Sequence, residues 1–202
     1  TIYEGIEAGR QMMVSRLKPT VIRLYDPGST EKSLQTTGLD IEGNYMVLMF
    51  DGIKEIAETE LKRALEICEE NHGEDLGSEL GKHWWDTRYV AYKPPVHPNY
   101  PQMYGTPETV TTYSNIVKIY DEKKKLVEEN YKEWGAKYTA HFSHWYPWGT
   151  MIYDRFYIDN PPEDADEALR LHNEIFEACS KVNLENGAVL NEHHGIGLKL
   201  GY

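Results

Sequence analysis

The clearest architectural signal in the chain is residues 136–159, AKYTAHFSHWYPWGTMIYDRFYID. The central Tyr-Pro-Trp-Gly segment is typical of a tight turn, so Ala136–Trp145 and Thr150–Asp159 are predicted to form an antiparallel hairpin. Successive side chains of a strand point to opposite faces, which places Tyr153 and Arg155 together on one face. The chain is therefore expected to contain an antiparallel sheet with polar groups on part of its surface.

Outward from this hairpin, the hydrophobic spacing alternates between helix and strand periods. The order of elements predicts an α+β fold, with helices packed on one face of a mainly antiparallel sheet. The first expected elements are a helix up to Lys18, a strand at 20–25 that ends at Asp26-Pro27-Gly28, and a strand at 45–50, whose continuous apolar run is typical of a buried strand. The later ones are helices at 53–71 and 75–85, a strand at 108–113, helices at 114–134 and 160–182, and a final strand; 28–44 and the proline-rich 93–101 are expected to be loops.

Composition narrows the class of protein. The 202 residues are 40% hydrophobic and 27% charged, which is typical of one globular domain with a substantial core. The net charge of −12, from 33 acidic and 21 basic residues, argues against a nucleic-acid partner. No apolar run approaches the roughly 20 residues that span a bilayer. Cys68 and Cys179 fall on the apolar stripes of predicted helices, which favours reduced thiols and a cytoplasmic protein, with peripheral membrane association left open.

Several residues are candidates for chemistry. Tyr153 stands beside a cation that favours its ionised form, so it could act as a general base, or it could pack as a core tyrosine. Arg23 lies in an otherwise apolar strand, where a salt bridge or an anionic substrate would have to balance its charge. Arg88 follows Trp84 and Trp85, which is typical either of a packed cation–π corner or of an anion-binding site.

The end of the chain combines imidazoles with glycines. His193 and His194 lead directly into Gly195 and Gly197, and this pattern suits either a ligand site or a polar junction. Near neutral pH an imidazole can donate or accept a hydrogen bond or bind a metal ion, and glycines let the backbone approach a ligand closely.

A metal centre is the main interpretation that needs no organic cofactor, because four imidazoles lie near predicted strand ends. The spacing argues against it. His141 and His144 are three apart on a strand and should point to opposite faces, and the adjacent His193 and His194 are not expected to converge on one ion. We therefore predict no metal site, and a His-ligated metal hydrolase stays an alternative.

Three segments taken together resemble a known family: VIRLYD at 21–26, SHWYPWGTMIY at 143–153 and HHGIG at 193–197. Their order and spacing resemble the C-terminal, substrate-binding half of FAD-linked oxidases of the vanillyl-alcohol oxidase superfamily, and within it the alkyldihydroxyacetonephosphate synthases. The resemblance implies that residues 1–202 form a cap domain. It also implies a FAD-binding domain that precedes this sequence, and an extreme C-terminus that follows it.

The same resemblance implies roles for the candidates. Tyr153 matches the catalytic tyrosine of the synthases, Arg23 an arginine needed for activity, and His193 and His194 the last two members of a triple-histidine motif. Gly195, together with Gly197, would let the backbone approach the flavin ring. The partners implied are FAD, the FAD-binding domain of the same protein and a small anionic substrate, with a homodimer left open.

Further residues are implied as substrate contacts, and two of them depart from the synthase pattern. Glu192 stands where the first histidine of the motif would be, and Asn115 stands where the synthases have a substrate-binding arginine. Arg155, Arg88 and His144 complete the candidate substrate-binding set.

The departures keep other functions open. An acidic residue before the last histidine also occurs in FAD enzymes that oxidise D-2-hydroxy acids, although the chain lacks their His-x-x-Asp-Gly-Asn segment. A synthase-like exchange of an acyl for an alkyl group on a dihydroxyacetone phosphate ester is the first hypothesis, and 2-hydroxy-acid oxidation is the second. A non-catalytic binding module with the same fold is the third.

Overall fold

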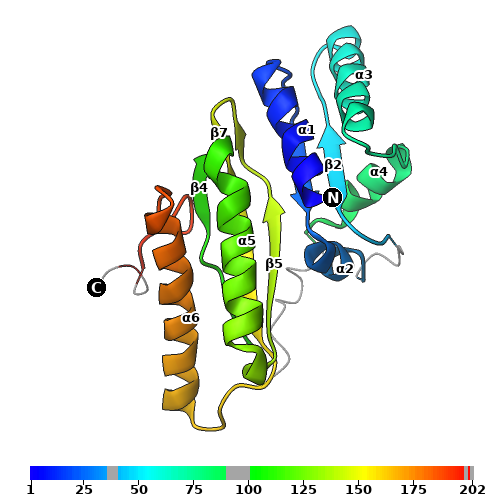
Figure 1. Ribbon diagram of the computed structural model, residues 1–202. Helices are drawn as coiled ribbons and strands as arrows, with labels where there is room; N and C mark the ends of the chain where they lie inside the picture. The colour runs from blue at the N-terminus through cyan, green and yellow to red at the C-terminus, as the bar shows by residue number, and fades with distance from the viewer. Residues whose placement is uncertain (36–40, 90–100, 198–199, 201–202) are drawn as a thin grey trace. The chain divides into compact units, whose positions relative to one another are not determined.

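The computed structural model describes residues 1–35, 41–89, 101–197 and 200 (Figure 1). The chain divides into two compact units, each considered by itself below. The first comprises residues 1–96 and 141–148, and the second comprises residues 97–140 and 149–202. Strand β5 (Ala136–Phe142) contributes to both, because the unit boundary falls between residues 140 and 141.

The first unit is built on β1, which pairs antiparallel with β2 on one side and with the end of β5 on the other. Leu24 and Tyr25 face Phe142 and His141 of β5. The elements are α1 (Ile2–Val14), β1 (Val21–Tyr25), α2 (Pro27–Gln35), β2 (Tyr45–Met49), α3 (Lys54–Glu70), α4 (Ser78–Thr87) and β6 (Trp145–Tyr146).

Both faces of this small sheet are covered. Met12 of α1 and Ile67 of α3 are fully buried and pack in one cluster with Ile22 of β1. On the opposite face, Trp84 of α4 packs against the buried Tyr45, and its indole N–H donates to the Tyr25 hydroxyl at 2.8 Å. The period of two in β1 therefore directs Ile22 towards α1 and α3, and Tyr25 towards α4.

The second unit is built on β7, a ten-residue strand whose neighbours are β3, β4 and β5. Strands β3 and β4 run antiparallel to it, and the six residues between β5 and β7 are too few for a parallel crossover. The predicted hairpin is thereby confirmed. The elements are β3 (Met103–Gly105), β4 (Thr109–Thr112), α5 (Tyr113–Asn130), the 3₁₀ turn η1 (Lys132–Trp134), β7 (Gly149–Ile158) and α6 (Ala165–Glu185).

Helices α5 and α6 pack against each other and against strands of this unit, as Figure 1 shows. Ile119 on α5, Ile152 on β7 and Ile175 on α6 are fully buried. Side chains at alternate positions of β7 thus face the helices, and the intervening positions, among them Tyr153 and Arg155, face the other way. The predicted α+β class with an antiparallel sheet is confirmed.

A buried ion pair joins α5 to β7 beneath this layer. Lys123 Nζ lies 2.7 Å from Asp154 Oδ2 and donates at 2.7 Å to the carbonyl oxygen of Pro107, and both charged side chains have no exposed surface. The Tyr138 hydroxyl donates to the same carboxylate oxygen at 2.9 Å. Burial raises the pKa of Asp154, against the opposing effects of Lys123 and Tyr138. The network fixes the helix-facing side of β7 and, with it, the direction of the flanking residues.

Three predictions about local structure were wrong. Residues 27–35 form helix α2 rather than a loop, since Pro27 opens the helix and Asp26 Oδ1 accepts the N–H of Ser29 at 2.8 Å, as at an N-cap. Strand β2 is an edge strand, half-buried along much of its length, rather than a fully buried one. Residues 186–197 form no strand, because side chains bind their backbone groups instead.

Other predicted helices and thiols agree with the structure. Helices α1, α3, α4 and α5 overlap the predicted ranges, whereas α6 begins at Ala165, with Asp164 as its N-cap, and not at residue 160 as predicted. Cys68 and Cys179 are free, and burial raises their pKa values to about 11 and about 12. The predicted loop at 93–101 lies almost entirely outside the described residues.

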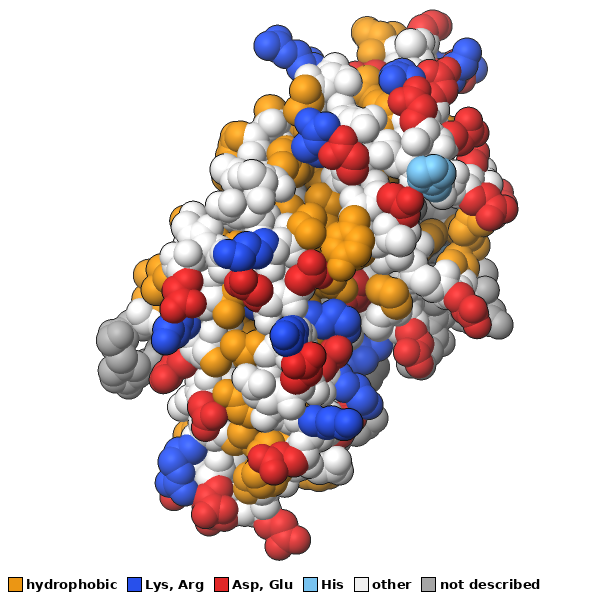
Figure 2. Space-filling model, in the orientation of Figure 1, with side chains coloured by type: hydrophobic (Ala, Val, Ile, Leu, Met, Phe, Trp, Pro, Cys, Tyr) orange, Lys and Arg blue, Asp and Glu red, His pale blue; other side chains and the backbone are white. Residues whose placement is uncertain are grey.

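Charged side chains of both signs lie next to one another on the face drawn in Figure 2. Ion pairs of this kind occur along two helices, Lys118–Glu122 at 3.6 Å on α5 and Lys181–Glu185 at 3.8 Å on α6. Within the described ranges, no helix combines the length and apolar character needed to cross a bilayer.

Candidate functional site

The polar face of the second unit is centred on Tyr153. This residue and Arg155 alternate with the buried Asp154 along β7, and the Arg155 guanidinium carbon lies 5.3 Å from the centre of the Tyr153 ring. Loss of solvent lowers the pKa of Arg155, but hydrogen bonds to Tyr153 and Tyr157 outweigh that effect and raise it overall. The predicted juxtaposition of a phenol and a permanent cation on one strand face is confirmed.

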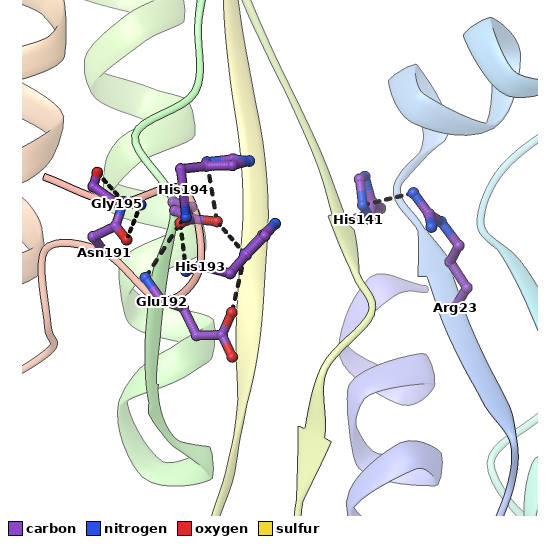
Figure 3. A network of polar contacts seen from close by, with 8 residues as sticks. Arg23, His141, Asn191, Glu192, His193, His194 and Gly195 are labelled. Carbon is purple, nitrogen blue, oxygen red and sulfur yellow. Dashed lines mark hydrogen bonds and ion pairs between the residues drawn. The ribbon is translucent and has the colours of Figure 1, made fainter. Parts of the chain in front are cut away.

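The segment that carries the two histidines is shaped by Asn191. Its Oδ1 accepts the N–H of Gly195 at 2.9 Å, and its Nδ2 donates to the carbonyl oxygen of Gly195 at 3.1 Å, as Figure 3 shows. Gly195 and Gly197 have φ angles of 81° and 52°, a region that glycine enters without strain. A Cβ atom at either position would meet no described atom within 4 Å, so the conformation rather than close packing accounts for these glycines.

Glu108 organises the histidines, although no sequence pattern singled it out. It precedes β4, its side chain is 1% exposed, and its Oε1 accepts the backbone N–H groups of residues 192, 193 and 194 at 3.2, 2.9 and 2.9 Å. Its Oε2 lies 2.8 Å from His193 Nδ1 and 3.2 Å from His194 Nδ1. One buried carboxylate thus contacts both the backbone and the side chains of the histidine segment.

The two imidazoles pack against Tyr153. The ring centres of His193 and His194 are 4.2 Å apart, and the His194 ring meets Tyr153 edge-on with centres 4.9 Å apart. Burial lowers the pKa of His194, and the nearby His193 and Arg155 act in the same direction, against the attraction of Glu108. At neutral pH, His194 is therefore held in its neutral form, able to accept a proton.

Glu192 adds a second carboxylate to this group. Its Oε2 lies 2.9 Å from His193 Nδ1, and Figure 3 shows its side chain directed towards that ring. The residue that departs from the synthase motif is therefore part of the cluster rather than a remote substitution.

Glu108, His193 and His194 also offer one ligand atom each within 4.8 Å of one another, a set that a metal ion could use. Contrary to the expectation that the adjacent histidines would not converge on one ion, both Nδ1 atoms lie near the Glu108 carboxylate, because the segment turns around it. Carboxylate and imidazole suit zinc, so the donor set alone does not separate a metal site from a hydrogen-bonding site.

Arg23, in the first unit, has a different environment from the predicted salt bridge. Its Nη2 lies 2.9 Å from Nε2 of the buried His141 (Figure 3), and its guanidinium carbon lies 5.5 Å from the Tyr25 ring centre and 5.9 Å from that of Trp84. Its Nε is buried and has no hydrogen-bond partner among the described residues. The guanidinium is thus held by rings and an imidazole, and no described carboxylate neutralises it.

Three further candidates are Arg88, His144 and Asn115. Arg88 stacks on Trp85 and Tyr89, with its guanidinium carbon 3.4 and 4.4 Å from the ring centres, which confirms the cation–π corner. His144 is half-buried between β5 and β6. Asn115 Nδ2 donates to the carbonyl oxygen of Asn186 at 3.0 Å and so joins the start of α5 to the end of α6.

Comparison with known proteins identifies the fold family. Residues 1–200 match the family described as FAD linked oxidases, C-terminal domain. The chain belongs to this family. The family name specifies the cofactor that its members use, and the match extends over both units.

Individual relatives of this FAD-linked oxidase domain are distant. Alkyldihydroxyacetonephosphate synthase from Dictyostelium discoideum is 23% identical over 223 residues, which cover 98% of this chain and 36% of the relative. Two solved structures of alkyldihydroxyacetonephosphate synthase, in crystal forms P212121 and P1, match with TM-scores of 0.72 and 0.69 at 19% and 20% identity. They cover 95% and 94% of this chain, which spans 39% and 38% of theirs, and they establish the shared fold.

Proposed function

We propose that this domain is the substrate-binding half of a FAD-dependent enzyme of the alkyldihydroxyacetonephosphate synthase type, which exchanges an acyl for an alkyl group on a dihydroxyacetone phosphate ester. The observation that carries the proposal is the cluster of Tyr153, His193 and His194 around the buried Glu108, on the strand face that is directed away from the helices. A FAD-binding domain outside this sequence would hold most of the cofactor.

The described residues fit a domain that binds the substrate while another domain holds most of the FAD. The cluster consists of a phenol, two imidazoles and a guanidinium, which are groups that move protons and bind anions. The described residues form no glycine-rich strand-to-helix turn of the kind that cradles a dinucleotide phosphate. FAD, when bound, supplies the electron-accepting ring beside which the substrate reacts.

Each side chain has a distinct proposed role. Tyr153 transfers a proton at the reacting carbon, while the neutral His194 and its neighbour His193 orient substrate oxygens. Arg155 contributes a positive charge that attracts a phosphate or carboxylate. In the first unit, Arg23 binds an anionic oxygen, a role supported by its lack of a described carboxylate partner.

The proton-transfer role is tested with Tyr153→Phe in the full-length protein. We expect flavin absorbance to be retained and turnover to fall by about 100-fold or more, because the variant loses only the hydroxyl. Tyr131→Phe is the matched control, since the Tyr131 hydroxyl donates to Glu174 outside the cluster. Unchanged turnover in Tyr153→Phe would reject Tyr153 as the proton-transfer group.

The substrate class needs a separate measurement. A synthase-like exchange leaves the flavin oxidised throughout, whereas a 2-hydroxy acid would bleach it on mixing. The contact of Glu192 with His193 makes the second outcome worth testing with D-lactate and glycolate. Bleaching by either acid, without exchange activity, would replace the synthase assignment with 2-hydroxy-acid oxidation.

Two further measurements test the flavin interpretation itself. The 202-residue chain expressed alone should carry no yellow flavin absorbance, and stoichiometric FAD in it would contradict a partner domain that holds the cofactor. One equivalent of tightly bound zinc in the full-length protein, lost in His193→Ala, would instead favour the metal alternative that the Glu108 cluster offers.

A further inference from the structure

The position of Glu108 follows from the strand register. Gly105 of β3 pairs with Phe156 of β7, and Thr109 of β4 pairs with Ile152, so both strands keep one register along the same partner. The pairing is interrupted at Pro107, which has no backbone N–H to donate. Within this register Glu108 stands opposite Tyr153, and side chains directly opposite each other lie on the same face of a sheet.

One oxygen of Glu108 fixes the backbone of the histidine segment. Three consecutive N–H groups converge on Oε1, which brings residues 192–194 around a single acceptor. A carboxylate that accepts several backbone hydrogen bonds is stabilised in its charged form, and the contacts in turn hold the segment in place.

The other oxygen faces the imidazoles. Oε2 is buried and receives no well-aligned hydrogen bond from the described residues, but it lies 2.8 Å from His193 Nδ1 and 3.2 Å from His194 Nδ1. A nitrogen lone pair at 2.8 or 3.2 Å from a carboxylate oxygen would be repelled, and each Nδ1 is therefore the atom that carries the proton. The Nε2 atoms are left with their lone pairs.

We propose that Glu108 is a positioning residue that holds the His193–His194 segment in place and sets the tautomer of His194, so that this ring presents a lone pair on Nε2 to the substrate. This inference rests on the proposed function for its catalytic consequence, but the tautomers themselves do not depend on it. A substrate hydroxyl, which donates a hydrogen bond, is the group that such Nε2 atoms match.

The discriminating variant is Glu108→Gln in the full-length protein. The amide oxygen can still accept the three backbone N–H groups, while the NH₂ group that replaces Oε2 would donate towards the Nδ1 atoms. A purely structural role of Glu108 therefore survives this substitution, and a role in setting the tautomer does not. Glu174→Gln on α6 is the matched control, because that carboxylate accepts only from Tyr131 among the described contacts and lies outside the cluster.

The primary readout is ¹⁵N NMR of histidine-labelled protein, with signals assigned by His193→Asn and His194→Asn. We expect Nδ1-protonated rings in the wild type. In Glu108→Gln we expect an Nε2-protonated His194 ring, while His193 keeps its Nδ1 proton because Glu192 Oε2 lies 2.9 Å from that nitrogen. The kcat should fall by about 10–100-fold with a smaller change in KM. Glu174→Gln should match the wild type in every measurement.

Several outcomes would overturn the inference. These are Nε2-protonated rings in the wild type, wild-type tautomers and kcat in a folded Glu108→Gln protein, or a wild-type zinc ion that Glu108→Gln loses. If Glu108→Gln does not fold, the wild-type spectrum alone still decides the tautomers. A protein that shows the predicted tautomer change but no flavin-dependent activity would refute the proposed function and leave the assignment of Glu108 intact.

Discussion

Lys123→Met is expected to destabilise the second unit by about 3–5 kcal/mol, because it leaves the Asp154 carboxyl buried without its cation. The two charged atoms are 2.7 Å apart and their side chains are fully buried. At that separation, with an effective dielectric constant of about 20, their attraction is about 6 kcal/mol, part of which offsets the cost of removing both charges from water. Methionine has a similar length and flexibility, so lost packing contributes little.

Urea unfolding followed by circular dichroism measures this loss, and the thermal midpoint should fall by about 6–20 °C if the domain unfolds as one unit. Lys124→Met is the matched control. Lys124 pairs with Glu128 on the surface, where its side chain is 41% exposed, so its removal should cost at most about 1 kcal/mol. The double variant Lys123→Met/Asp154→Leu removes both buried charges and should be more stable than Lys123→Met.

The loss of stability in Lys123→Met should also depend on pH. Burial already raises the pKa of Asp154 with Lys123 in place, and Lys123→Met removes the largest effect that opposes this shift. A carboxyl group with a higher pKa in the folded than in the unfolded state costs stability as it ionises. The deficit of Lys123→Met should therefore be smallest in acid and grow as the pH rises above about 4. A loss below about 1 kcal/mol at neutral pH, or a double variant less stable than Lys123→Met, would refute the reasoning.

Three further predictions concern other parts of the domain. Gly149→Ala should lower the free energy of unfolding in urea by about 1–3 kcal/mol, since its Cβ would fall on the carbonyl oxygen of Thr111. Gly81→Ala, in an open part of α4, should raise it by about 0.5–1 kcal/mol. A change of the same sign in both variants would contradict this reasoning. Asp26→Ala should cost about 0.5–2 kcal/mol through the lost cap of α2, and an unchanged urea midpoint would show that the cap is dispensable. The pKa of His194 is lowered on folding, so the neutral ring favours the native state. The free energy of unfolding should therefore decline as the pH falls below about 6.5, and His194→Gln should reduce this dependence on pH. The same pH dependence in the variant and the wild type would contradict the prediction.

Periodicity predicted the helices and the hairpin, because each of these elements buries one face of its own residues. An element that depends on a cap and a proline, and not on hydrophobic spacing, was not predicted. Residues 27–35 are rich in serine, threonine and glycine, yet Asp26 and Pro27 together start a helix there. The signal for α2 was present in the Asp-Pro pair and was interpreted only as the end of a strand.

The site was predicted in part for a related reason. Tyr153 and Arg155 share a face because strand geometry requires it, whereas the meeting of Tyr153 with His193 and His194 depends on contacts across about forty residues. Glu108 escaped notice because a single glutamate before a strand resembles any surface carboxylate in sequence. Only its burial, and the three N–H groups on one of its oxygens, distinguish it.

Neighbouring residues of β7 contribute to different properties, one to stability and the others to the candidate site. Asp154 is directed towards α5 and held by Lys123, while Tyr153 and Arg155 on either side are directed towards the histidine segment. Rotation of β7 about its axis would separate Asp154 from Lys123. The ion pair therefore also limits the movement of Tyr153 and Arg155, on the opposite face of the strand. Loss of Lys123 should therefore reduce turnover as well as stability, whereas loss of the Tyr153 hydroxyl should reduce turnover alone.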